Sequence, residues 1–282
     1  MIHMGLIGFP LAHSYSQRLH ERALDVLGLE GKYHLWEIPP LPQGKEELIS
    51  KLKDLREGHL KGANVTIPHK RSVLYFVDRL TPMAQAVGAV NTLYLDPQRD
   101  HVVGENTDSP GFWVDVRKVL LTVRKGEKPR ALILGAGGAA RAATHALLTH
   151  GWSVSIAARR ISQAESVAKH FGDQGRAVEV YHLSERASLK LEACRLIVNA
   201  TPVGMAPDTA SSPWPQSWEF PKKALVYDLV YNPAQTLFMR QARGGGLEVR
   251  NGLGMLVEQA ALAFKRWTGA EPPRREMLEV VR

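Results

Sequence analysis

The sequence predicts an α/β protein of two domains, and three patterns lead to this prediction. First, short apolar runs alternate with amphipathic segments in the N-terminal part, as expected for parallel strands joined by helices. The runs are MGLIG, YHLWEI and ANVTI, and the helical segments lie near residues 16–28, 45–57 and 69–77. Second, the alternation starts again at ALILG, residues 131–135. Third, apolar residues recur at helical spacing from residue 253 to residue 267, which predicts a long late helix.

The composition is that of a globular protein. Hydrophobic residues make up 44% and charged residues 23% of the 282 residues, so each domain can bury a core of its own. No apolar run approaches the length of a membrane span, and the N-terminus enters an apolar strand without the features of a signal peptide. We therefore expect a cytoplasmic protein with no membrane partner.

Charge and cysteine content narrow the expected ligands. The net charge is +8, but the basic residues are dispersed and form no dense stripe with aromatic residues. Solubility and small anionic ligands explain this excess better than nucleic acid does. The single cysteine, Cys194, lies in an apolar run and is expected to be a buried strand thiol. No histidine pair stands at ligand spacing beside acidic residues, so we expect no metal.

The order of the elements predicts where the domains meet. A strand pair near 89–104 and a helix over Pro110–Leu121 are expected to precede a basic hinge at 124–130. We expect the first domain to span residues 1–108 and the second 109–251. The late helix is expected to cross back, so residues 252–282 are assigned to the first domain.

The stretch GANVTIPHK, residues 62–70, is typical of a half-exposed strand that leads into a candidate site. Its alternation puts Asn64 and Thr66 on one face and turns Val65 and Ile67 inward. A proline ends the strand, and Lys70 follows it. The alternative is a surface strand edge with a solvated lysine.

A glycine-rich turn opens the second domain. LILGAGGAARA places G-x-G-x-x-A directly after a strand and before an alanine-rich helix. The first glycine suits the tight turn, the second lets the backbone approach a pyrophosphate, and Ala140 allows close packing of helix and strand. We expect a Rossmann-type dinucleotide site here, formed by Gly135, Ala136, Gly137, Gly138 and Ala139.

The end of the next strand indicates which dinucleotide binds. An NAD site usually has an acidic residue about 20 positions on, to accept a hydrogen bond from the ribose. SVSIAARRISQ offers Arg159 and Arg160 there and no carboxylate. Two guanidinium groups suit a 2′-phosphate, so the sequence favours NADP over NAD. The alternative is that both arginines only cap the strand at the surface.

Several separated motifs make the chain similar to one family. They are GFPLAHSYS, ANVTIPHK, GAVNTL, ENTD, GAGGAARA, NATPVGM, DLVYNP and NGLGMLVEQAA, in this order. Over essentially its whole length the chain resembles the shikimate dehydrogenases. The resemblance implies an α/β substrate domain with a mainly parallel sheet, followed by the NADP domain. It also implies reversible reduction of 3-dehydroshikimate by NADPH to shikimate, a step towards aromatic amino acids.

The resemblance implies roles for individual residues. Lys70 would be the general acid and base at the reacting oxygen, and Asp108 would hold the substrate hydroxyl and the lysine. The other implied substrate contacts are Ser14, Ser16, Thr66, Asn91, Tyr231 and Gln259, and the strand alternation adds Asn64 on the substrate face. The implied cofactor contacts, besides the glycine turn and the two arginines, are Thr201, Leu229, Gly252 and Met255.

From the residues alone, the role of Lys70 stays open between taking the proton and stabilising developing negative charge. Neutral hydrogen-bonding side chains suit a small polyhydroxylated anion. Each of them also has a structural alternative, with Ser14 as a helix cap, Asn91 as a turn residue and Gln259 as a solvated side chain.

The sequence departs from the family pattern at the end of the second cofactor strand. The usual Asn-Arg-Thr is Ala158, Arg159 and Arg160 here, and a later basic position is Gln163. NADP stays the expected cofactor, and tolerance of NAD is open.

Two alternatives share the fold. One is a quinate and shikimate dehydrogenase that uses NAD, which the two arginines and the retained Ser16 disfavour. The other is a catalytically silent NADPH-binding regulator, which should have lost Lys70 and Asp108. The expected state is a monomer or a homodimer.

Overall fold

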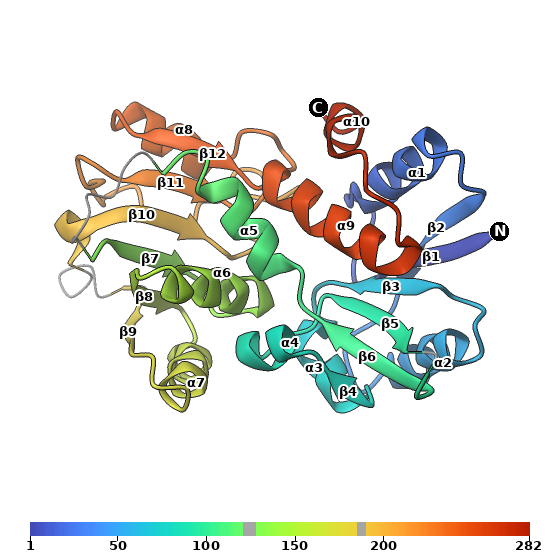
Figure 1. Ribbon diagram of the computed structural model, residues 1–282. Helices are drawn as coiled ribbons and strands as arrows, with labels where there is room; N and C mark the ends of the chain where they lie inside the picture. The colour runs from blue at the N-terminus through green and yellow to red at the C-terminus, as the bar shows by residue number, and fades with distance from the viewer. Residues whose placement is uncertain (97, 121–127, 185–189) are drawn as a thin grey trace. The chain divides into compact units, whose positions relative to one another are not determined.

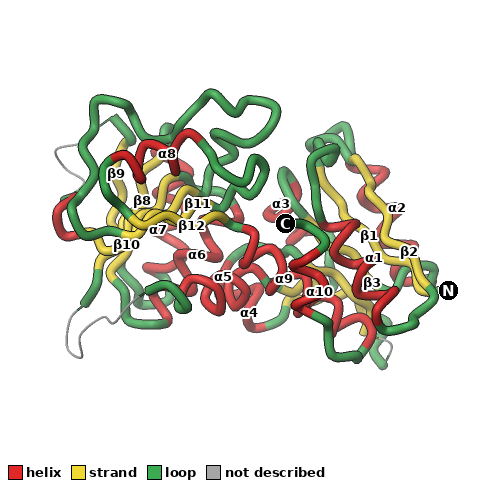
Figure 2. The backbone as a smooth tube through the Cα atoms, turned by 90° about the horizontal axis from the view of Figure 1, so that it is seen from above, coloured by secondary structure: helices red, strands yellow, loops and turns green. Residues whose placement is uncertain are grey.

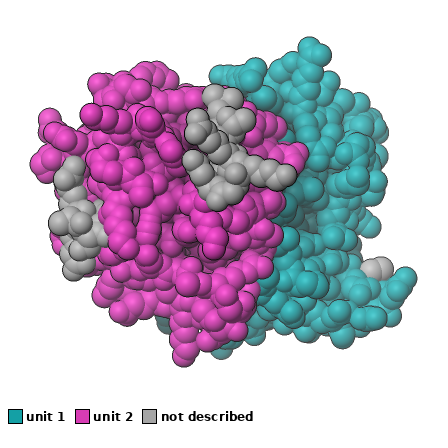
Figure 3. Space-filling view, turned by 60° about the vertical axis from the view of Figure 1, so that its left-hand side comes forward, with its two compact units in different colours: residues 1–111, 256–282 teal, residues 112–255 magenta. Residues whose placement is uncertain are grey.

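The computed structural model describes residues 1–96, 98–120, 128–184 and 190–282. The chain divides into two compact units (Figure 3). Unit 1 comprises residues 1–111 and 256–282, and unit 2 comprises residues 112–255. Most of the basic segment 124–130, expected to be a hinge, lies outside the described residues.

Unit 1 is built on a mixed sheet of order β2-β1-β3-β5-β6-β4 (Figure 1). β1 pairs in parallel with β2 and β3, whereas β5 pairs antiparallel with β3 and β6. The strands are β1 (Ile2–Gly8), β2 (Gly31–Glu37), β3 (Gly62–Val65), β4 (Arg79–Leu80), β5 (Thr92–Asp96) and β6 (His101–Glu105). The expected strand pair near 89–104 is thus confirmed as the β5–β6 hairpin.

Helices cover this sheet and connect its strands. They are α1 (Ser16–Val26), α2 (Lys45–Arg56), α3 (His69–Ser72), α4 (Pro82–Val87), α9 (Leu253–Thr268) and α10 (Arg274–Glu279), with the 3₁₀ turn η1 (Val73–Tyr75). α5 (Asp108–Val116) begins in unit 1 and continues into unit 2. Leu48, Leu52 and Leu55 of α2 pack on one sheet face with Ile7 and Val65. α5 was expected over Pro110–Leu121, but it begins at Asp108 and ends at Val116.

The late helix returns to unit 1, as predicted. The indole of Trp267 on α9 donates a hydrogen bond to the carbonyl of Leu93, 3.0 Å away, on β5. A Cβ on Gly62 would lie 2.0 Å from the same indole nitrogen, so only glycine lets α9 approach β3 this closely. The final helices therefore belong to the core of unit 1.

The expectation of a half-exposed strand at 63–67 is wrong. β3 lies inside the sheet between β1 and β5, and all of its residues are buried. Ile67, expected to face inward, lies past the strand end and is 55% exposed. A strand with a neighbour on each side and helices over both faces is buried throughout, which period-2 alternation does not reveal.

Unit 2 is built on an entirely parallel sheet of order β12-β11-β10-β7-β8-β9. Its strands are β7 (Arg130–Leu134), β8 (Ser153–Ala158), β9 (Val178–His182), β10 (Cys194–Asn199), β11 (Leu225–Asp228) and β12 (Glu248–Asn251). This is the strand order of a Rossmann fold, with the switch point between β7 and β10. Cys194 is a buried strand thiol, as expected.

Helices lie on both faces of the parallel sheet (Figure 2). α5, α6 (Gly138–Thr149) and α7 (Ile161–Gly172) pack on one face. α8 (Leu237–Gly244) packs on the other, together with the buried side chain of Trp214. Among the described residues, no helix is both long and apolar enough to cross a membrane.

A buried histidine makes unit 1 sensitive to acid. His20 on α1 is fully buried, and its ring stacks on Tyr33 with centroids 4.3 Å apart. Burial lowers the pKa of His20 to about 3, and the neighbouring Asn64 side chain offsets this only in part. As the pH falls through 6.5 the unfolded chain takes up a proton here while the folded chain does not, so the free energy of unfolding falls.

We predict that His20 alone removes about 2 kcal/mol of stability between about pH 7 and about pH 5. His20→Phe keeps a ring in the stack but cannot take up a proton, so its free energy of unfolding should depend less on pH by this amount. Urea unfolding at both pH values measures the difference. Ile49→Phe, which adds a ring but no titratable group at an exposed site of unit 1, should keep the wild-type pH dependence. Equal dependence in His20→Phe and the wild type would contradict the prediction.

Candidate functional site

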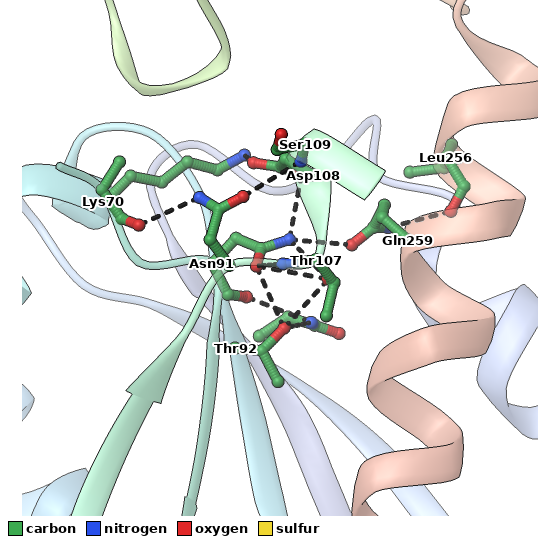
Figure 4. Close-up of polar contacts among 11 residues, drawn as sticks. Lys70, Asn91, Thr92, Thr107, Asp108, Ser109, Leu256 and Gln259 are labelled. Atoms are coloured by element: carbon green, nitrogen blue, oxygen red, sulfur yellow. Dashed lines mark hydrogen bonds and ion pairs between the residues drawn. The ribbon is translucent and has the colours of Figure 1, made fainter. Parts of the chain in front are cut away.

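The centre of the candidate site in unit 1 is an ion pair between Lys70 and Asp108. Lys70 stands on the short helix α3, one turn after β3, and Asp108 is the first residue of α5, just after β6. The lysine Nζ lies 2.5 Å from Oδ2 of the aspartate (Figure 4). The aspartate side chain is 4% exposed and the lysine side chain 15%, so the ammonium reaches the surface of the site while the carboxylate is enclosed.

The side-chain amide of Asn91 holds the other oxygen of this carboxylate. Its Nδ2 donates to Oδ1 of Asp108 over 2.9 Å and to Oγ1 of Thr107 over 2.9 Å. Its Oδ1 accepts the backbone N–H of Thr107 over 2.7 Å. An amide whose oxygen is held by a backbone donor has its NH₂ group turned to the opposite side. Asp108 is thereby held by Asn91 through one oxygen and by Lys70 through the other.

Gln259 brings the late helix into the same cluster. Its Oε1 lies 3.2 Å from Nδ2 of Asn91, and its Nε2 donates to the carbonyl of Leu256 over 2.9 Å. The side chain is only 8% exposed, so the alternative of a solvated glutamine is wrong. Asn91 is 2% exposed and bonded to several groups, so it is no free turn residue either.

Two residues of this cluster were not selected from the sequence. Thr107 is 5% exposed and bonds to both ends of the Asn91 amide. It stands inside the ENTD motif, which was the available signal. Thr92 bonds to Asn91 and Thr107 through its hydroxyl, and no sequence pattern distinguished it from an ordinary strand threonine.

Asn64 lies behind the site. It is 4% exposed, accepts a hydrogen bond from the Tyr33 hydroxyl over 2.8 Å, and donates to the carbonyl of Asn91 and the hydroxyl of Thr92. The expectation that it lines an exposed strand face is therefore wrong. Thr66 follows β3 and is half-buried, and its methyl group lies where a Cβ on Gly8 would be.

The serine loop follows β1 in the same unit. Ser14 is half-buried, and its Oγ accepts the backbone N–H of Ser16 over 3.2 Å. Ser16 is the first residue of α1 and is 5% exposed. The alternative that Ser14 helps to start this helix thus has structural support, and its contact with a substrate stays a prediction.

The glycine turn in unit 2 has the geometry of a dinucleotide site. Gly135 follows β7 with a φ of +102°, and a Cβ there would also lie 2.8 Å from the Thr201 methyl group. Gly137 is exposed and precedes α6, and a Cβ on it would meet nothing within 4 Å. The turn therefore leaves open space in front of the first N–H groups of a twelve-residue helix, where a phosphate group binds well.

The turn after β10 completes this edge of the parallel sheet. Oδ1 of Asn199 accepts from the backbone N–H and the hydroxyl of Thr201. Nδ2 of Asn199 donates to Asp228 over 2.8 Å. Burial raises the pKa of Asp228 to about 6, although donors including Thr236 favour its charged form. Since β7 and β10 flank the switch point, their carboxyl ends are where a Rossmann fold binds its ligand.

The remaining predicted cofactor residues also lie in unit 2. A Cβ on Gly252 would lie 2.2 Å from the carbonyl oxygen of Leu229, so the two backbones are in direct contact. Met255 is 7% exposed. Arg159 and Arg160 are exposed directly after β8, and the carbonyl of Arg159 lies 3.1 Å from His182. Their role as a phosphate clamp stays a prediction.

Tyr231 is the one predicted substrate residue that belongs to unit 2, so its contact with the substrate stays a prediction. Among the described ranges, one trio of possible metal ligands comes together, Asp54, Glu57 and His59. Two of these are exposed, and none is a predicted site residue. Lys51 already pairs with Asp54 over 2.5 Å.

Two family descriptions match the chain. Residues 6–93 match the shikimate dehydrogenase substrate binding domain, and residues 252–282 match the shikimate 5′-dehydrogenase C-terminal domain. The NADP(+)-dependent shikimate dehydrogenase of Carboxydothermus hydrogenoformans is 38% identical over 98% of this chain and 95% of its own length.

Solved structures agree with this relationship. The shikimate 5-dehydrogenase of Thermus thermophilus, in complex with NADP(H) and shikimate, is 38% identical, with a TM-score of 0.84 over 100% of this chain and 99% of its own. A quinate dehydrogenase from Corynebacterium glutamicum in complex with NAD is 31% identical, with a TM-score of 0.85 over 99% of this chain and 98% of its own. Sequence identity and fold agree over the full length of the chain, which therefore belongs to the shikimate dehydrogenase family.

Proposed function

We propose that this chain is an NADP-dependent shikimate dehydrogenase, which reversibly reduces 3-dehydroshikimate to shikimate on the way to aromatic amino acids. The observation that carries the proposal is the Lys70–Asp108 pair with Asn91 and Gln259 around it. These side chains supply an ammonium donor, a fixed carboxylate and neutral amides, which suit a polyhydroxylated anion with one reacting oxygen.

In this proposal Lys70 transfers the proton. A lysine ammonium has three donors, and Asp108 takes one of them, which leaves others for a substrate oxygen. In the reduction, Lys70 gives a proton to the ketone oxygen as the carbon becomes an alcohol. In the reverse reaction it takes that proton back. Asp108 orients the ammonium and accepts from a neighbouring substrate hydroxyl.

The other predicted contacts would hold the ring for this transfer. Ser14, Ser16 and Tyr231 would bind the substrate carboxylate, while Thr66, Asn91 and Gln259 would bind its hydroxyls. Neutral donors hold a carboxylate without a compensating charge and orient the ring for attack on one face.

The unit 2 residues fit a bound dinucleotide phosphate. Gly135 and Gly137 keep side chains out of the space before α6, so its N–H groups can reach a pyrophosphate. When bound, NADPH supplies the hydride. Arg159 and Arg160 are exposed where the adenosine ribose is expected, and they would pair with its 2′-phosphate.

The proposal also covers the setting of the reaction. The partners are small molecules, without nucleic acid or a membrane, and the enzyme acts in the cytoplasm as a monomer or homodimer.

The first experiment follows reduced nicotinamide by its absorbance, with shikimate or quinate as substrate and NADP or NAD as cofactor. Fast reaction with shikimate and NADP alone supports the proposal. Comparable rates with NAD or quinate move the chain to the broader quinate and shikimate branch. No turnover in a folded protein that binds NADPH favours the silent regulator.

We predict that Lys70→Ala lowers kcat by about 10² to 10⁴, since it removes the positioned general acid and base. KM for shikimate and NADP should change much less. Steady-state kinetics, with each substrate varied in turn while the other is saturating, measure both constants. Lys61→Ala, at an exposed lysine just before β3, is the matched control and should keep wild-type rates. A Lys70→Ala enzyme with near-normal kcat would rule out the assigned role.

We predict that Arg159→Ala and Arg160→Ala each raise KM for NADP about tenfold or more, because a charge-assisted hydrogen bond to phosphate is lost. KM for NAD, which lacks the 2′-phosphate, should stay within about twofold. Comparing the two single variants shows how much each arginine contributes to binding the 2′-phosphate. The comparison is informative because Ala158 and Gln163 replace the residues usual in the family. Arg195→Ala, at an exposed arginine of β10, is the control. Parallel changes for both cofactors would refute the phosphate clamp.

A further inference from the structure

A buried hydrogen-bonded path leads from the edge strand β2 to the catalytic carboxylate. It starts at Tyr33, which is 1% exposed and donates to Oδ1 of Asn64 over 2.8 Å. Asn64 then donates to the carbonyl of Asn91 over 3.1 Å and to Oγ1 of Thr92 over 3.2 Å. The path spans four neighbouring strands, because β1 lies between β2 and β3, and Asn64 is the register partner of Thr92 on β5.

The path ends on the group that orients Asp108. Oγ1 of Thr92 donates to Oδ1 of Asn91 over 3.1 Å, on the side opposite the NH₂ group that holds Asp108. Asn64 thus holds the main chain at Asn91 and also the hydroxyl that bonds to the Asn91 amide. Two contacts thus connect Asn64 to Asn91, and the Tyr33 hydroxyl holds the side-chain oxygen of Asn64.

Packing alone does not require these polar groups. A leucine has nearly the shape of asparagine, and phenylalanine has the shape of tyrosine without its hydroxyl. Replacing both partners of a buried hydrogen bond by apolar groups of the same shape is often nearly neutral for stability. Two of the groups that Asn64 contacts keep partners without it, since Val65 N–H also donates to the carbonyl of Asn91 over 2.8 Å and Thr92 bonds to Asn91 and Thr107.

We propose that Tyr33 and Asn64 are positioning residues of the reaction, which set the orientation of the Asn91 amide and, through it, of the Lys70–Asp108 pair. This assignment rests on the proposed function. Neither residue touches the reacting atoms; both act through Asn91.

The test is the double variant Tyr33→Phe/Asn64→Leu, which removes the path and leaves an apolar pair. We expect a folded protein whose kcat for reduction of 3-dehydroshikimate is lower by about tenfold, because small misplacement of catalytic groups is costly. KM for NADPH should stay within about twofold. The pH profile of kcat should shift, since the carboxylate beside Lys70 is held less firmly.

Two comparisons separate positioning from a loss of packing. Trp267→Phe removes a hydrogen bond of similar length to the carbonyl of Leu93 in the same sheet. It should lower thermal stability while the pH profile of kcat stays that of the wild type. The chemical shifts of the Asn91 side-chain amide in ¹H–¹⁵N NMR should change in the double variant and remain at wild-type values in Trp267→Phe. This measurement does not depend on enzyme activity.

The outcomes are distinct. A wild-type enzyme that does not turn over shikimate refutes the proposed function, and the Asn91 signals still test the path. A double variant with wild-type kcat, pH profile and Asn91 signals overturns the positioning role. If the double variant does not fold, Tyr33→Phe alone replaces it, since this change removes only one oxygen atom. We expect smaller changes of the same kind in kcat, in its pH profile and in the Asn91 signals. Wild-type values of all three would overturn the proposal.

Discussion

The orientation of one buried amide, that of Asn91, controls the polar contacts of the candidate site. The oxygen of Asn91 is held by the backbone N–H of Thr107, so its nitrogen must face Asp108. If the amide turned over, two acceptors would meet at Asp108 and two donors at the Thr107 N–H, and both mismatches would be buried. An unpaired buried polar group costs about 1 to 3 kcal/mol. This cost keeps the carboxylate, and therefore Lys70, in one arrangement.

The mixed sheet of unit 1 is what brings these residues together. Asn91 and Asp108 are 17 positions apart, yet the antiparallel turn between β5 and β6 returns the chain to the same end of the sheet. The backbone N–H of Asn91 donates to the carbonyl of Glu105 over 3.0 Å, which brings the start of one strand beside the end of the other. Lys70 arrives from β3 on the other side of β5, and α9 adds Gln259. In a wholly parallel sheet β5 would begin at the opposite edge, and Asn91, just before β5, would lie away from Lys70 and Asp108.

Unit 2 presents backbone groups, with few side chains, at the sheet edge where a Rossmann fold binds its ligand. Its turn after β7 has a glycine with positive φ and an exposed glycine, so open space lies in front of the first N–H groups of α6. Asp228 is buried beside Asn199, and its raised pKa reflects the cost of keeping a charge there. Arg159 and Arg160, directly after β8, are exposed.

The sequence by itself determined the two-unit α/β fold, the glycine turn, and the pairing of Lys70 with Asp108, because local periodicity and ordered motifs carry that information. Tertiary structure decided what depends on contacts between distant strands. β3 is buried on both sides, so Asn64 lies behind the site and not on an exposed strand face as the sequence predicted. Ile67, which was expected to face inward, is exposed. The tertiary structure also brings Tyr33 into hydrogen-bond contact with Asn64, 31 positions away, and buries Gln259 beside Asn91. Residue spacing along the chain does not predict these contacts, because they depend on the order of the strands in the sheet and on the packing of α9 against unit 1.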